Sequence, residues 1–102
     1  MAISHLYGLI GYPLGHSFSK AYFTEKFEKL GLSETHAYEQ FPIPSIDEFK
    51  AILAANPNLK GLNVTIPYKQ VVMPLLDEID LAAAQIGAVN TIKIAADGYT
   101  RG

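Results

Sequence analysis

The feature that most constrains this sequence is a short, nearly continuous apolar run close to its start. Leu6 to Gly11 read Leu-Tyr-Gly-Leu-Ile-Gly, and Gly11 and Pro13 close the run. A run of this length without polar alternation is typical of a strand that is covered on both faces in a parallel sheet. We therefore predict a strand over 4–10 with further structure packed on both of its sides.

Helix and strand patterns alternate along the rest of the chain. An amphipathic pattern built on Phe23, Phe27 and Leu30 predicts a helix that ends at Gly31. Ser45 and Glu48 have the spacing of a capping box, which predicts a helix up to Asn56. A short Ala-rich helix is expected at 80–86. Strands are expected at 35–42, 62–66 and 88–94, and a return strand is expected after the turn at 97–98.

This order predicts an α/β fold. We expect a three-layer α/β/α domain with a mostly parallel sheet and an antiparallel hairpin at its C-terminal end. The sequence has 102 residues, and no linker, repeat or low-complexity tract divides it. Residues 1–102 are therefore expected to form a single domain.

Composition excludes several classes of function. Eight Lys and Arg against ten Asp and Glu give a formal net charge of −2, so we expect no nucleic-acid partner. The chain has no Cys and three scattered His, so we expect no disulfide framework and no metal. No apolar run approaches the roughly 20 residues that span a bilayer, and the start lacks the pattern of a signal peptide. We expect a cytoplasmic chain that does not bind a membrane.

Ligands of open α/β sheets bind outside the carboxyl ends of the strands. The segments to search are therefore 11–19, 63–69 and 88–91. In the first, Ser17 and Ser19 precede a helix, where hydroxyls and backbone N–H groups can hold an anion. In the second, Asn63 and Thr65 point to one side of an otherwise apolar strand, and Lys69 follows. In the third, Asn90 stands at the start of a strand.

Each of these segments, taken alone, also has a plain structural explanation. The two serines could cap a helix, Lys69 could be a solvated surface lysine, and Asn90 could serve a turn. Tyr7, Tyr12, Tyr38, Tyr68 and Tyr99 form no regular stripe, and we interpret them as core or rim residues.

Taken together, the three segments resemble the N-terminal, substrate-binding domain of the shikimate dehydrogenase family. The matching residues are Tyr7-Gly8-Leu9-Ile10-Gly11 with His16-Ser17-Phe18-Ser19, then Gly61-Leu62-Asn63-Val64-Thr65-Ile66-Pro67-Tyr68-Lys69, then Ile86-Gly87-Ala88-Val89-Asn90-Thr91. Their order and spacing cover essentially the whole chain. Enzymes of this family reduce 3-dehydroshikimate to shikimate with NADP(H), in the pathway to chorismate and the aromatic amino acids.

The resemblance implies a role for six residues. Ser17 and Ser19 match the paired serines that bind the substrate carboxylate, and Thr65 and Asn90 match residues that contact its hydroxyls. Asn63 matches a residue that makes a less important contact with the substrate. Lys69 matches the catalytic lysine, which binds the reacting oxygen and donates a proton to it.

The chain departs from the family pattern in two ways. Lys20 stands where the family usually has Pro, which adds a positive charge near the expected carboxylate site. The family also continues beyond this point with an Asp that partners the catalytic Lys and with a Rossmann-type domain that binds NADP, and neither is found before Gly102. The resemblance therefore implies a catalytically incomplete piece of a larger enzyme, whose own C-terminal nucleotide domain is its partner.

Other interpretations stay open from the sequence alone. The chain could belong to a quinate/shikimate dehydrogenase, or it could be a stand-alone module that binds a small polyhydroxylated acid without redox chemistry. We expect the isolated domain to be monomeric or weakly associating, and a homodimer stays open.

Overall fold

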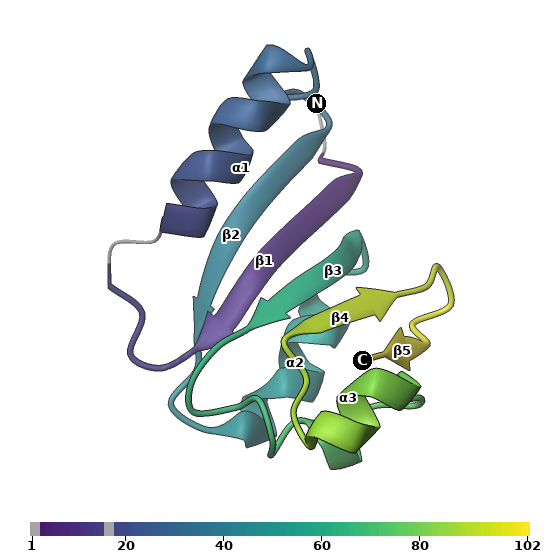
Figure 1. Ribbon diagram of the computed structural model, residues 1–102. Helices are drawn as coiled ribbons and strands as arrows, with labels where there is room; N and C mark the ends of the chain where they lie inside the picture. The colour runs from purple at the N-terminus through teal and green to yellow at the C-terminus, as the bar shows by residue number, and fades with distance from the viewer. Residues whose placement is uncertain (1–2, 16–17) are drawn as a thin grey trace.

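The structure, a computed structural model, describes residues 3–15 and 18–102. Figure 1 shows one twisted sheet with helices around it. The elements in chain order are β1 (His5–Gly11), α1 (Phe18–Lys29), β2 (His36–Pro42), a 3-10 turn (Ile46–Glu48), α2 (Phe49–Ala55), β3 (Leu59–Val64), a second 3-10 turn (Met73–Leu75), α3 (Leu81–Ile86), β4 (Thr91–Ile94) and β5 (Thr100–Arg101).

The sheet is mixed and has β1 near its centre. Its strand order is β2-β1-β3-β4-β5. Strand β1 pairs in parallel with β2 and with β3, whereas β4 runs antiparallel to both β3 and β5. One strand therefore opposes the direction of the other four, and β4 and β5 form the expected hairpin. The α/β fold class predicted from the sequence is confirmed.

The hydrophobic core lies on the face of the sheet that α2 covers. Leu6, Ile10 and Leu62 from this face are buried together with Phe49, the first residue of α2, which is fully buried. Alternate strand residues point to opposite faces, so the opposite face carries Tyr7, whose ring contacts α1. Helices thus pack on both faces (Figure 1).

Helix α1 packs on the sheet through a narrow aromatic contact. Phe23 stacks on Tyr38 of β2 with ring centroids 5.0 Å apart, and Phe27 lies 6.1 Å from Tyr7 of β1. None of the residues of α1 is fully buried. Leu30, which the sequence pattern assigns to the apolar face, lines the same groove as Phe23 and Phe27 but is 60% exposed. The helix stops as expected, with Gly31 at a φ of 71°.

Several expected element boundaries differ from the observed ones. Strand β3 occupies 59–64 rather than 62–66, because Thr65 turns away from β4 and donates its backbone N–H to Ile10. Strand β4 begins at Thr91 rather than at residue 88, because the N–H of Val89 donates to Lys69 instead of to the sheet. The Ser45 hydroxyl accepts from the N–H of Asp47 rather than from that of Glu48, so the expected capping box forms only in part.

The close packing of neighbouring atoms around Gly8 on β1 gives a test of this fold. An added Cβ at Gly8 would lie 2.4 Å from the Phe41 ring and 2.7 Å from the carbonyl oxygen of Glu39. We expect Gly8→Ala to lower the free energy of unfolding by about 1–3 kcal/mol, because overpacking forces the β1–β2 pair apart. Urea denaturation measures this.

Gly15→Ala is the matched control, because its added Cβ meets no atom of the described residues within 4 Å. Equal stability of the two variants would contradict the packing of Phe41 against Gly8.

Candidate functional site

Three polar segments meet at one edge of the sheet. The carboxyl ends of β1 and β3 lie at this edge, and the antiparallel β4 begins there (Figure 1). The backbone N–H of Thr65 donates to the carbonyl of Ile10 at 2.9 Å, and the N–H of Val64 donates to the carbonyl of Asn90 at 2.9 Å. The chain segments that the sequence analysis selected are therefore joined by backbone hydrogen bonds.

Thr65 is placed by a close approach to Gly11 at the end of β1. A Cβ at Gly11 would lie 2.4 Å from the Thr65 methyl carbon and 3.0 Å from the carbonyl oxygen of Ile66. Gly11 is buried and Thr65 is half-buried. Thr65 can therefore pack against β1 because Gly11 has no side chain.

Asn63 belongs to a half-buried set of hydrogen-bonded side chains that spans β1. Its side-chain N–H donates to the Tyr38 hydroxyl at 2.8 Å, and Ser19 in the first turn of α1 also hydrogen-bonds this hydroxyl. Tyr38 is 3% exposed. Burial raises the pKa of Tyr38, and the two hydrogen bonds oppose that rise only in part. The phenol therefore stays neutral near pH 7 and holds two predicted site residues from different elements.

Lys69 and Asn90 face a different space. Both line a cavity of about 440 Å³ beside α3, together with Asp80, Ile86 and Gly102. The carbonyl of Lys69 accepts from the N–H of Val89 at 2.8 Å. The Lys69 side chain is half-buried and Asn90 is exposed. The backbone thus fixes the lysine beside the asparagine.

Tyr68 anchors the loop that carries Lys69. Its ring is 6% exposed, and its hydroxyl donates to the carbonyl of Ile43, which follows β2. Burial is the largest cause of its raised pKa. The residue before the candidate catalytic lysine is therefore tied to the core.

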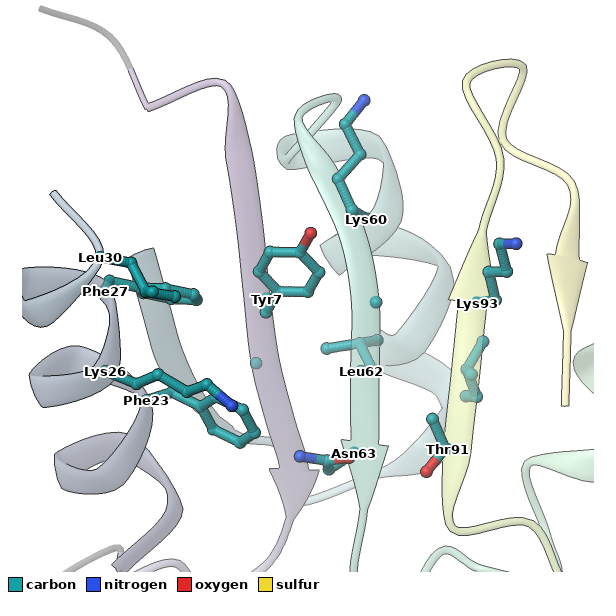
Figure 2. A pocket seen from close by; sticks show the side chains of 13 residues that line it. Tyr7, Phe23, Lys26, Phe27, Leu30, Lys60, Leu62, Asn63, Thr91 and Lys93 are labelled. Carbon is teal, nitrogen blue, oxygen red and sulfur yellow. The ribbon is translucent and has the colours of Figure 1, made fainter. Parts of the chain in front are cut away.

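Thr91 lies between Asn63, on the α1 face of the sheet, and the cavity that Lys69 and Asn90 line. Its hydroxyl lies 3.4 Å from the side-chain oxygen of Asn90, to which it donates, and it pairs with Asn63 across β3 and β4. Thr91 also lines both the cavity of Lys69 and a groove of about 450 Å³ on the α1 face. Figure 2 shows Asn63 and Thr91 at one end of this groove, whose walls include Tyr7, Phe23 and Phe27.

Two expectations concern the first loop. Ser17 lies outside the described residues, so its predicted place beside Ser19 stays a prediction. Lys20 places its ammonium 3.6 Å from the carboxylate of Glu39 on β2, which brings that positive charge to the edge strand.

Sequence reasoning missed three positioning residues. Tyr38 and Tyr68 were interpreted as core or rim, and both are buried, but their hydroxyls also hold site segments. Gln40 of β2 donates to the carbonyl of Gly15 in the first loop at 3.0 Å. The available signal was that these side chains carry hydroxyl or amide groups, but pairing each with a partner 25 residues away requires the register of the sheet.

This geometry defines an α/β domain that presents hydroxyl, amide and ammonium groups at the carboxyl edge of its sheet. The family model of the shikimate dehydrogenase substrate binding domain matches residues 9–92. The chain belongs to this family.

Relatives and solved structures agree with this assignment. A shikimate dehydrogenase (NADP(+)) from Halothermothrix orenii is 47% identical over 85 residues, which cover 83% of this chain and 29% of the relative. A shikimate 5-dehydrogenase from Listeria monocytogenes, in complex with shikimate and NAD, is 37% identical with a TM-score of 0.81, over 96% of this chain and 33% of that one. A quinate dehydrogenase from Corynebacterium glutamicum, in complex with NAD, is 38% identical with a TM-score of 0.81, over 99% of this chain and 37% of that one. The chain thus spans about a third of the length of these proteins.

The first loop does not fit the pyrophosphate of a dinucleotide. Such a site needs a glycine at the strand end that lets the ligand approach the backbone. Here the space above Gly11 is filled by Thr65 and Ile66, and the loop lacks the three-glycine spacing. Within residues 3–15 and 18–102, no cluster of three or more His, Asp or Glu side chains is arranged to hold a metal ion, and no helix is long and apolar enough to cross a bilayer.

The hydrogen bonds that join Tyr38 to Asn63 and Ser19 can be tested by removing the Tyr38 hydroxyl. We expect Tyr38→Phe to lower the free energy of unfolding by about 1–2 kcal/mol, because Asn63 and Ser19 both lose their common partner while the ring keeps its packing. The side-chain amide signal of Asn63 should shift in the NMR spectrum.

Tyr22→Phe is the control, because Tyr22 is 49% exposed on α1. A Tyr38→Phe protein with unchanged stability and an unshifted Asn63 amide would refute the bridging role of the phenol.

Proposed function

We propose that this chain is the substrate-binding part of an NADP-dependent shikimate dehydrogenase, which reduces 3-dehydroshikimate to shikimate. One observation carries the proposal: in a chain of this family, Asn63, Thr65, Lys69 and Asn90 are brought to one edge of the sheet by backbone hydrogen bonds. These residue types suit a small acid that carries several hydroxyls, because each can donate or accept a hydrogen bond at a fixed place.

The substrate carboxylate is proposed to bind Ser17 and Ser19 at the start of α1. Hydroxyls there can donate to an anion, and the unpaired N–H groups of a helix start favour negative charge. Ser19 is held by Tyr38, which also holds Asn63. This arrangement supports a substrate that lies with its carboxylate toward α1 and its ring hydroxyls toward Asn63, Thr65 and Asn90.

Lys69 is proposed to act on the reacting oxygen. Reduction of a carbonyl adds a hydride to carbon and a proton to oxygen, and this chain is proposed to supply the proton. An ammonium at the mouth of a cavity can both stabilise the negative charge that develops on the oxygen and donate a proton to it. The tie of its backbone to Val89, and of Tyr68 to Ile43, supports this role by limiting where the side chain can reach.

NADP is proposed to bind outside residues 1–102. The misfit of the first loop supports this, as does the greater length of the relatives. A nucleotide domain of the same protein is thus the proposed partner of this chain, and a cytoplasmic location and a homodimer remain predictions.

Quinate is the alternative substrate, and one comparison favours it, since a quinate dehydrogenase is among the similar structures. Both acids carry a carboxylate and several ring hydroxyls. The ratio of kcat/KM for shikimate to that for quinate, measured in the protein that contains this chain, decides between them.

The serine pair should act on substrate binding rather than on chemistry. We expect Ser17→Ala with Ser19→Ala to raise KM for shikimate about ten- to a hundredfold with kcat nearly kept, because a hydrogen bond to a charged group is worth roughly 1.5–3 kcal/mol and the carboxylate does not change during the reaction. Ser33→Ala, an exposed serine outside the site, is the control. An unchanged KM in the double variant removes these serines from the site.

The lysine should act on the chemical step. We expect Lys69→Met to lower kcat at least a hundredfold and to change KM much less, because general acid catalysis is worth about 10²–10⁴ in rate and the proton matters chiefly in the transition state. Steady-state oxidation of shikimate with NADP, in the longer protein that contains this chain and the nucleotide domain, measures this.

Lys29→Met serves as the control, because Lys29 is exposed on α1 and pairs with Glu25. Near-normal kcat in Lys69→Met would show that the lysine only binds, and absence of shikimate turnover in the unsubstituted longer protein that contains this chain and the nucleotide domain would refute the proposed function.

A further inference from the structure

Two histidines stack at the end of the sheet that lies opposite the candidate site. His5 and His36 are the first residues of β1 and β2 and are paired in register. Their imidazole rings are parallel within 3° and have centroids 4.3 Å apart. Each ring is half-buried.

Hydrogen bonds fix both rings in this stack. The Nδ1 atom of His5 lies 2.8 Å from the Ser4 hydroxyl, and that of His36 lies 2.7 Å from the Thr35 hydroxyl. The backbone N–H groups of Ser4 and His5 both donate to the carbonyl of Thr35 at 3.0 Å. The residues that hold the two rings are therefore the same ones that join the starts of β1 and β2.

The stack also contacts α1. The ring of Phe27 lies 5.4 Å from that of His36 and 6.1 Å from that of Tyr7, and Figure 2 shows Phe27 reaching from α1 toward the strands. Because none of the residues of α1 is fully buried, this aromatic contact is a large part of what holds the C-terminal half of the helix.

We propose that His5 and His36 form a proton-sensitive clasp, which holds the starts of β1 and β2 and the C-terminal half of α1 together while the pair carries at most one proton. A second proton places two positive charges about 4.3 Å apart in a partly desolvated stack, where they repel. This inference does not depend on the proposed function.

The surroundings of the pair carry charges of both signs. The titratable groups on the neighbouring elements are Tyr7 on β1, Lys60 on β3, Tyr38 and Glu39 on β2, Glu34 in the turn before β2, and Lys20, Tyr22, Glu25, Lys26, Glu28 and Lys29 on α1. Two of these carboxylates are in ion pairs, since Glu39 lies 3.6 Å from the Lys20 ammonium and Glu25 lies 3.1 Å from that of Lys29. The pKa of His36 nevertheless lies below its usual value of 6.5, through burial first and the charge of His5 second, so the carboxylates do not offset the two causes that lower it.

The sign of the pH effect follows from this lowered pKa. The folded state binds a proton at His36 less readily than the unfolded state does, so the clasp contributes stability above about pH 6.5 and loses it as the pH falls through the lower pKa of His36. Asp77, whose pKa is lowered by hydrogen bonds from Thr100, loses its contribution only below about pH 4, so the two effects occupy different pH windows.

The test compares stability between pH 7.5 and 5 in the unsubstituted protein, His5→Gln, His36→Gln and the double variant. We expect the loss of melting temperature over this range to shrink in each single variant, and to shrink less in His5→Gln than in His36→Gln, because burial still opposes protonation of His36 when His5 is replaced. The effects of the two substitutions should be less than additive in the double variant, because removing either ring abolishes the repulsion. His16→Gln, the remaining histidine, should behave as the unsubstituted protein does.

NMR gives a second readout. The titration midpoint of His36 should lie below 6.5 and should rise toward it in His5→Gln, and hydrogen-exchange protection of α1 amides should fall more than that of α2 amides at low pH. Additive effects of the two substitutions, an equal loss of the pH effect in His16→Gln, or equal loss of protection in α1 and α2 would overturn the proposal. Where a variant does not fold, a His36 midpoint at or above 6.5 in the unsubstituted protein overturns it.

Discussion

The parallel pairing of β1 with β2 and β3 brings the segments that follow these strands to one edge of the sheet. The last two residues of β1 also accept hydrogen bonds from residues that follow its neighbours: the carbonyl of Ile10 accepts from Thr65 after β3, and the carbonyl of Gly11 accepts from Ile43 after β2. The segment after β3 and the segment after β2 are thus both fixed to the end of one strand. Because parallel strands end at the same edge, the candidate site follows from this pairing before any side chain is considered.

Two positions on β1 must lack a side chain for this pairing to hold. Phe41 occupies the space beside Gly8, and Thr65 occupies the space beside Gly11. The Phe41 contact packs the edge strand β2 against β1. The Thr65 contact places Thr65, whose hydroxyl is a candidate ligand-binding group, against the end of β1. Gly8 is therefore required by Phe41, 33 positions further along the chain, and Gly11 is required by Thr65, 54 positions further along.

Sequence periodicity predicts the elements but not the contacts between them. The fold class, the hairpin and the stop of α1 at Gly31 followed from apolar spacing and turn residues, which are local signals. The start of β4 did not, because Val89 donates to Lys69 in a distant loop. Tyr38 shows the same limit: the sequence leaves it as a core or a rim residue, and its hydrogen bonds to both Ser19 and Asn63 depend on three elements meeting across β1. Family resemblance selected the site residues, and it carried no information on what positions them.

The two ends of α1 are held by groups that respond differently to protons. At its start, Ser19 bonds a phenol whose raised pKa keeps it neutral throughout the physiological range. At its other end, Phe27 packs on His36, an imidazole whose pKa is lowered by burial and by the charge of His5. A fall in pH therefore loosens the helix from its C-terminal end while the hydrogen bond at its start persists. The candidate carboxylate-binding turn is thereby separated, by the length of one helix, from the part of the fold that is most sensitive to protonation.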